Sequence, residues 1–122
     1  MAVGDIHWIE YPSIGGREQS GRRPAILIQD EQYGRRSPLI LTVPLTTTAS
    51  TLHRFPAVVP ILPMAMNGLT RDSFALVFQL RAVDRGMLRE RIGVLEPAIM
   101  VRIFEALDRL LGRSGDQNLR GT

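Results

Sequence analysis

The chain has 122 residues, a length that fits one compact domain, and its apolar (44%) and charged (22%) fractions are ordinary for a globular protein. Cysteine is absent, which excludes disulfides, thiolate metal sites and cysteine nucleophiles. Lysine is absent too, so all 15 basic residues are arginine, and the formal net charge of +3 is by itself weak evidence for nucleic-acid binding. No apolar run approaches the roughly 20 residues of a membrane span, and no signal peptide is evident, so we expect a cytoplasmic protein.

Short apolar and β-branched runs, separated by turn residues, predict a mainly β fold. The first run alternates apolar and polar residues, and the second is continuously apolar, as expected of a buried strand. A short helical turn, capped by Asp84, is predicted at 84–89. The strands are predicted at residues 5–10, 24–29, 39–45, 57–62, 73–83 and 91–95.

One longer helix is predicted near the C-terminus, because Pro97 suits its first turn and Gly112 its C-cap. Short strands followed by one helix are typical of a small β-barrel with an appended helix. We assign residues 1–112 to this single domain and residues 113–122 to a flexible polar tail. An apolar stripe at helical spacing is interpreted as core that covers the sheet, and it comprises Ile99, Met100, Ile103, Phe104, Leu107, Leu110 and Leu111.

The loop in front of the second predicted strand is the most informative segment. Residues 15–24 combine three glycines with one carboxylate, Glu18, and three guanidiniums, Arg17, Arg22 and Arg23. Arginine binds phosphate in a planar, bidentate manner, so this loop suits the binding and cleavage of a phosphodiester. A solvated loop whose charges have no function is the alternative.

RNA can be cut without a metal when its own 2′-hydroxyl attacks the adjacent phosphorus. The reaction needs a base for the hydroxyl proton, fixed positive charge for the phosphorane and a proton source for the leaving oxygen. Glu18 is a candidate base, Arg23 a candidate for the charge, and Thr46, at the end of the third predicted strand, a candidate hydrogen-bond donor to phosphate. Arg23 could instead form a purely structural ion pair with Glu18, and Thr46 could be an ordinary threonine at a strand end.

Five motifs occur in this order along the chain: residues 4–8 (GDIHW), 18–25 (EQSGRRPA), 43–46 (VPLT), 79–84 (QLRAVD) and 91–95 (RIGVL). Together they resemble the MazF/PemK family of toxin endoribonucleases from type II toxin–antitoxin modules, over about Val3 to Leu111. The resemblance implies an SH3-like barrel with a C-terminal helix, the fold shared by MazF- and CcdB-type toxins. It also implies a homodimer that needs no metal or cofactor. Such an enzyme cuts single-stranded mRNA at short sequences, leaving 2′,3′-cyclic phosphate and 5′-hydroxyl ends, and an acidic MazE-like antitoxin inhibits it.

Matched residue by residue, the family's catalytic arginine falls on Arg23, its catalytic threonine on Thr46 and its loop glutamate, a base in some members, on Glu18. The family's RNA contacts fall on two glutamines, and the remaining candidates are polar residues of the loops and of the fifth predicted strand. The residues predicted to contact RNA are Arg17, Gln19, Arg22, His53, Gln79 and Arg81.

Two positions depart from the family pattern. Arg17 stands where many members have serine, and Phe78 stands where many have an acidic residue. We interpret Phe78 as core, with stacking on a base as the alternative. Trp8 is also interpreted as core and His7 as structural, because both belong to the first strand; two isolated histidines argue against a metal site.

Two other functions fit the same fold. One is a non-catalytic toxin like the CcdB poisons of DNA gyrase, and the other is an inactive RNA-binding barrel. The set of Glu18, Arg23 and Thr46 distinguishes the first of these from an endoribonuclease, since a gyrase poison has no need of it.

Overall fold

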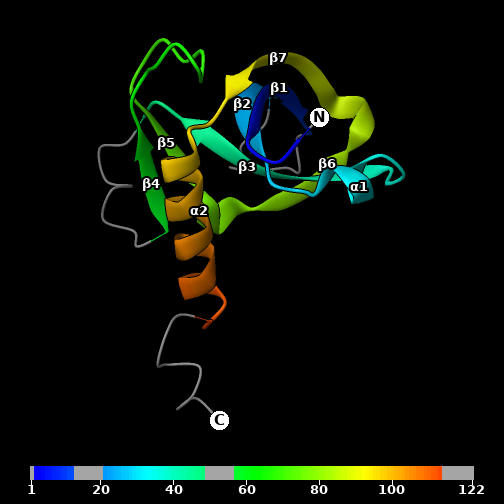
Figure 1. Cartoon of the computed structure of the whole chain (residues 1–122). Coiled ribbons are helices and arrows are strands. Elements are labelled where there is room, and N and C mark those ends of the chain that lie inside the picture. Colours follow the sequence, from blue (N-terminus) through cyan, green and yellow to red (C-terminus); the bar gives the residue numbers. More distant parts are fainter. Residues whose placement is uncertain (1, 13–20, 49–56, 114–122) are drawn as a thin grey trace.

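A computed structural model describes residues 2–12, 21–48 and 57–113, which form seven antiparallel strands and a C-terminal helix (Figure 1). This confirms the predicted fold class. The helices and strands are β1 (Asp5–Tyr11), β2 (Gly21–Leu27), α1 (Glu31–Gly34), β3 (Leu39–Thr46), β4 (Val58–Ile61), β5 (Ser73–Leu76), η2 (Val77–Gln79), β6 (Arg81–Asp84), η3 (Arg85–Met87), β7 (Leu88–Val94) and α2 (Pro97–Leu110).

The strands form one sheet in the order β4-β5-β3-β2-β1-β7, with β6 as a further partner of β3. The sheet curls on itself (Figure 1), but in the described part of the chain no ladder joins β4 to β7, so the predicted barrel is open. Strand β3 is central because β2 pairs with one of its edges while β6 and β5 share the other.

The single strand predicted at 73–83 is wrong, because η2 divides it into β5 and β6. Leu45 faces Ala75, so an uninterrupted strand would bring Phe78 opposite Thr42, whereas Thr42 faces Arg81. The register therefore moves by three residues along β3, and the three residues of the turn take up this difference. The helical turn after β6 is confirmed, with the Asp84 carboxylate accepting a hydrogen bond from the Gly86 amide at 2.7 Å.

The side chains on the two faces of the sheet belong to two different hydrophobic clusters, because successive side chains of a strand point to opposite faces. Ile26 of β2 belongs to the larger cluster, which α2 covers, whereas Ala25 and Leu27 belong to the smaller one. Strand alternation therefore places Arg23 on the face of the smaller cluster and Pro24 on the face of the larger.

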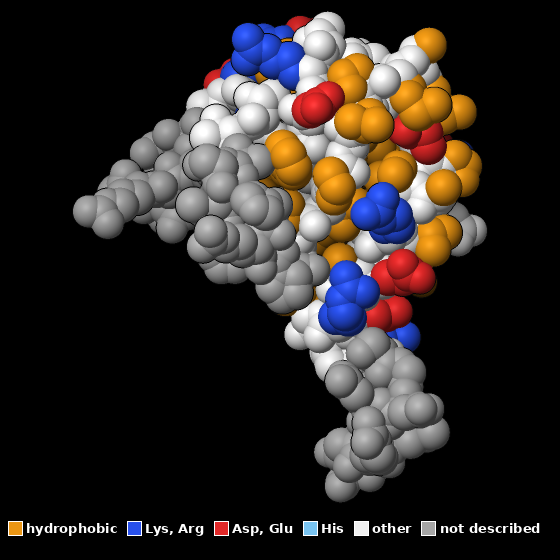
Figure 2. All heavy atoms as spheres, turned by 90° about the vertical axis from the view of Figure 1, so that its left-hand side faces the viewer, with side chains coloured by type: hydrophobic (Ala, Val, Ile, Leu, Met, Phe, Trp, Pro, Cys, Tyr) orange, Lys and Arg blue, Asp and Glu red, His pale blue; other side chains and the backbone are white. Residues whose placement is uncertain are grey.

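Helix α2 begins at Pro97 as predicted, and Gly112, with φ of +71°, follows its last turn. The apolar stripe is only partly core, however. Met100 and Ile103 are buried, but Phe104 and Leu110 are 41% and 47% exposed. The stripe is wider than the surface that the sheet covers, and many apolar side chains are visible on the face shown in Figure 2.

The segment between β4 and β5 is held by a buried side chain, Asn67, which is 0% exposed. Its Oδ1 accepts hydrogen bonds from the amides of Met64 (3.1 Å) and Leu69 (3.0 Å). Its Nδ2 donates to the Leu62 carbonyl (2.9 Å) and to the Glu96 carboxylate (3.0 Å), just before α2. One amide thus holds both sides of the connection and joins it to the helix.

Tyr11 ends β1 inside the smaller cluster, 3% exposed, with its hydroxyl 2.8 Å from Thr42 Oγ1. Burial raises the pKa of Tyr11 to about 12, and this effect outweighs the hydrogen bond with Thr42 and the positive charges of Arg81 and Arg23, which lower that pKa.

Replacing Asn67 with alanine should lower the free energy of unfolding by about 2–3 kcal/mol, because several buried backbone groups lose their partner together. Urea denaturation measures this change. Gln32→Ala removes an exposed amide of α1 and is the matched control. Equal unfolding midpoints for the two variants would contradict the role given to Asn67.

The stability contributed by the neutral Tyr11 phenol should be complete below about pH 10 and decline as the pH rises toward about 12, because the unfolded chain loses this proton first. From about pH 8 to about pH 11 the loss should reach about 1.4 kcal/mol. Urea denaturation of the parent and of Tyr11→Phe over this pH range isolates the pH-dependent stability that comes from the Tyr11 phenol. A difference between the two proteins that stays constant with pH would contradict the raised pKa.

Candidate functional site

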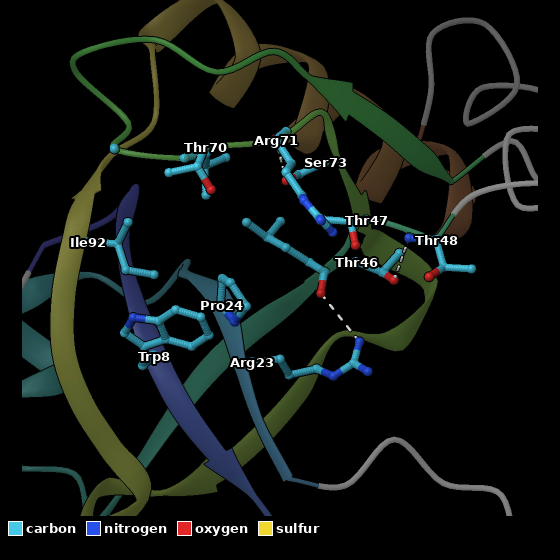
Figure 3. A pocket seen from close by; sticks show the side chains of 13 residues that line it. Trp8, Arg23, Pro24, Thr46, Thr47, Thr48, Thr70, Arg71, Ser73 and Ile92 are labelled. Atoms are coloured by element: carbon cyan, nitrogen blue, oxygen red, sulfur yellow. Dashed lines mark hydrogen bonds between the residues drawn. The ribbon is translucent and has the colours of Figure 1, made fainter.

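A cleft of about 450 Å³ opens where β2 and β3 meet the connection between β4 and β5 (Figure 3). Threonine hydroxyls and two guanidiniums contribute to its polar surface. None of the lining residues that the structure describes is acidic, so this part of the cleft carries positive charge. Its lining residues are Trp8, Arg23, Pro24, Leu45, Thr46, Thr47, Thr48, Gly68, Leu69, Thr70, Arg71, Ser73 and Ile92.

Arg23 and Thr46, the two predicted catalytic residues in the described part of the chain, both line this cleft. The β2–β3 ladder pairs Ala25 with Pro44, and the same antiparallel register continued by two residues brings Arg23 opposite Thr46. The Arg23 guanidinium donates a hydrogen bond from Nη1 to the Leu45 carbonyl at 3.3 Å. One of its five N–H groups is thus used to fix the side chain over the end of β3.

The Thr46 hydroxyl is oriented by its own strand end. Its Oγ1 accepts a hydrogen bond from the Thr48 amide at 3.2 Å. A hydroxyl that accepts through one lone pair keeps its proton for donation. The strand end therefore offers a guanidinium and a hydroxyl donor side by side, an arrangement that suits two oxygens of one phosphate.

The cleft also contains polar residues that the sequence interpretation missed, above all Arg71 and the threonines beside Thr46. The run of three threonines after the third strand was a visible signal for a polar strand end. Arg71 had no such signal, because it joins the cleft only through the path of the connection between β4 and β5.

Arg22, a predicted RNA contact, does not line the cleft. It forms an ion pair with Glu90 of β7, and its Cζ lies 5.2 Å from the centroid of the Trp8 ring. The pKa of Glu90 is lowered, first by a hydrogen bond from the backbone amide of Glu90 to its own carboxylate and next by the hydrogen bond from the Arg22 side chain. Trp8 itself is half-buried, and one side of it lines the cleft, so its interpretation as core is wrong in this respect.

Gln79 and Arg81 also lie outside the cleft lining. Arg81 stacks on Tyr11, with its Cζ 4.9 Å from the ring centroid, and its carbonyl accepts a hydrogen bond from Thr42 Oγ1 at 3.0 Å. Phe78 is 40% exposed because it belongs to the turn η2, so its interpretation as core is wrong.

Four predicted residues, Arg17, Glu18, Gln19 and His53, lie outside the described residues. His7 does not line the cleft; its Nδ1 is 2.9 Å from the Arg89 carbonyl of β7. Across residues 2–12, 21–48 and 57–113, no three histidine, aspartate or glutamate side chains gather as metal ligands, and none of the helices has the length and apolar character of a membrane span.

Comparisons with known proteins agree with this geometry. A family model described as PemK-like, MazF-like toxin of type II toxin–antitoxin system matches residues 2–111. Endoribonuclease EndoA of Bacillus subtilis is 31% identical over 104 residues, which cover 85% of this chain and 88% of that protein.

Two crystal structures from Deinococcus radiodurans are also similar. One is MazF (TM-score 0.76, 25% identity, 92% of this chain and 96% of that one), and the other is MazE–MazF (TM-score 0.73, 27% identity, 93% and 97%). The resemblance expected from the motifs is therefore confirmed over nearly the whole domain, and the chain belongs to the PemK-like, MazF-like family of toxins from type II toxin–antitoxin systems.

Proposed function

We propose that this protein is a sequence-specific endoribonuclease toxin that cuts single-stranded mRNA in the cytoplasm without a metal ion. The observation that carries the proposal is the placement of Arg23 and Thr46 together in one cleft, opposite each other when the β2–β3 register is continued by two residues. Relatives named as endoribonucleases, among them EndoA of Bacillus subtilis and MazF of Staphylococcus epidermidis, support it.

The reaction begins with attack of the ribose 2′-oxygen on phosphorus. A bond forms between phosphorus and the 2′-oxygen while the bond to the 5′-oxygen of the next nucleotide breaks. The leaving 5′-oxygen takes a proton from solvent water, so the products are a 2′,3′-cyclic phosphate and a 5′-hydroxyl end. Arg23 neutralises the charge that builds up on the phosphorane, and Thr46 donates a hydrogen bond to a non-bridging oxygen. We assign to Glu18 the role of the base that removes the 2′-hydroxyl proton, because it stands three residues before β2 begins.

The role of Arg23 is electrostatic in this proposal. A guanidinium keeps its proton under all conditions in which proteins stay folded, so it is a poor general acid and a good fixed cation. The hydrogen bond to the Leu45 carbonyl supports this role, because a positioned charge acts without reorganisation when the phosphorane forms.

An antitoxin and a second copy of the chain are the proposed partners. The two guanidiniums that line the described part of the cleft favour a carboxylate-rich antitoxin segment that displaces RNA. The exposed apolar side chains of α2, among them Phe104 and Leu110, suit the interface of a homodimer.

Incubation of the purified chain with a long RNA of mixed sequence in EDTA should give discrete fragments with 2′,3′-cyclic phosphate ends. Mapping of the 5′ ends identifies the recognised sequence. A 2′-deoxy substitution at the mapped nucleotide should abolish cleavage there, because the attacking oxygen is then missing. Intact RNA, together with inhibition of DNA supercoiling by gyrase, would favour the CcdB-like alternative.

Arg23→Ala should lower kcat roughly a hundredfold, because one preorganised charge on a phosphorane is worth about 3 kcal/mol. Thr46→Ala should lower it less, since a neutral donor is lost. Arg36→Ala, at an exposed turn residue after α1, is the matched control. Single-turnover cleavage measures the effect, with circular dichroism to verify folding. Cleavage by Arg23→Ala at the parent rate would show that the charge-stabilising residue lies elsewhere.

A further inference from the structure

The cleft contains a second guanidinium that the reaction above does not use. Arg71 extends from the connection before β5 toward Thr47, on the side of the β3 end opposite to Arg23 (Figure 3). Thr46 lies between the two guanidiniums in this view. One phosphate on Arg23 and Thr46 therefore leaves Arg71 with Thr47 as a separate pair of donors.

Strand pairing explains why Arg71 reaches this place. Thr46 pairs with Phe74 of β5, so the residues that precede β5 run past the residues that follow β3. Ser73 fixes the start of β5, since its hydroxyl is buried and donates to the Arg71 carbonyl at 3.0 Å. Arg71 has an exposed side chain on a backbone that is held by the sheet.

Specific contacts also hold the remainder of the connection between β4 and β5. Asn67 holds both of its sides, as described above. Gly68 has φ of +69°, and a Cβ at this position would overlap the Ile92 carbonyl oxygen of β7. The Val94 amide donates to the Met66 carbonyl at 3.0 Å. The connection is thus packed on β7, which gives Arg71 a defined starting point.

Arg71 forms no ion pair within the part of the chain that the structure describes, in contrast to Arg22, whose charge Glu90 offsets. An arginine of this kind, aimed into a cleft beside threonine hydroxyls, suits a phosphate oxygen anion. A single-stranded RNA carries further phosphates on either side of the scissile one, and Arg71 lines the same cleft as Arg23.

We infer that Arg71, with the Thr47 hydroxyl, binds a non-scissile phosphate of the RNA next to the one that is cut. This inference rests on the proposed function, since it requires RNA in the cleft. Arg71 is a positioning residue in this assignment: it holds the chain so that the scissile phosphate meets Arg23, and it does not contact the reacting atoms. Its loss should therefore raise KM while kcat changes little.

The test uses the full chain and a short RNA that contains the mapped cleavage sequence. Arg71→Gln should raise KM about tenfold and leave kcat within about twofold, since an exposed charge-assisted contact is lost. Binding of a 2′-deoxy, uncleavable version should show a salt slope smaller by about 0.7, the value for one phosphate contact on a single strand. Arg71→Lys keeps the charge and should keep the parent slope, and Arg36→Gln is the control for charge alone.

A scan of single neutral methylphosphonates along the RNA locates the contact. Neutralising one non-scissile phosphate should raise the KM of the parent but not the already raised KM of Arg71→Gln. The assignment is wrong if the methylphosphonate that raises the KM of the parent but not that of Arg71→Gln is the one at the scissile phosphate. It is also wrong if Arg71→Gln matches Arg36→Gln in KM and salt slope. If Arg71→Gln does not fold, the same scan on the parent and on Arg71→Lys decides, since a scissile-only effect contradicts it. A parent chain that neither binds nor cuts RNA would remove the proposed function as well.

Discussion

The pairing of β3 along both of its edges is the constraint on which the rest of the structure depends. On one edge β2 runs antiparallel to it and carries Arg23 to the level of Thr46. On the other edge β6 pairs with its first half and β5 with its last residues. The end of β3 is therefore where Arg23 of β2 and the connection before β5 both approach Thr46.

This arrangement separates the work of positioning from the work of binding. Backbone ladders, the buried Asn67 amide and the Leu45 carbonyl define where the side chains begin. The functional groups themselves, Arg71 and the threonines after β3, remain at the surface. An enzyme whose substrate is a flexible strand gains from such rigidity, because the protein then loses little conformational entropy on binding.

Sequence patterns predicted the fold class, most strands and α2, since apolar periodicity and turn residues are local signals. The division of the fifth predicted strand was not predictable in this way. It follows from a three-residue change of register against β3, which only the pairing partner reveals. Phe78 was misassigned for the same reason, because a residue in a turn does not follow the alternation of a strand.

The candidate site was predicted in part. Arg23 and Thr46 lie in motifs close to strand ends, so a resemblance and a strand prediction were enough to bring them together. The role of Trp8 and the contribution of Arg71 depended on long-range packing of the connection between β4 and β5 against β7. Arg22 was predicted as a phosphate contact from its place in the loop, but its strand face sends it toward Trp8 and Glu90.

In the part of the chain that the structure describes, the cations that line the cleft are Arg23 and Arg71, and the chain contains no lysine at all. Acetylation of lysine, a common means of removing positive charge, therefore has no target here. Changes in acidity within the range that a cell tolerates leave guanidinium groups charged as well. A molecule that brings its own negative charge can still neutralise the cleft, so an acidic partner suits the control of a site built from arginine.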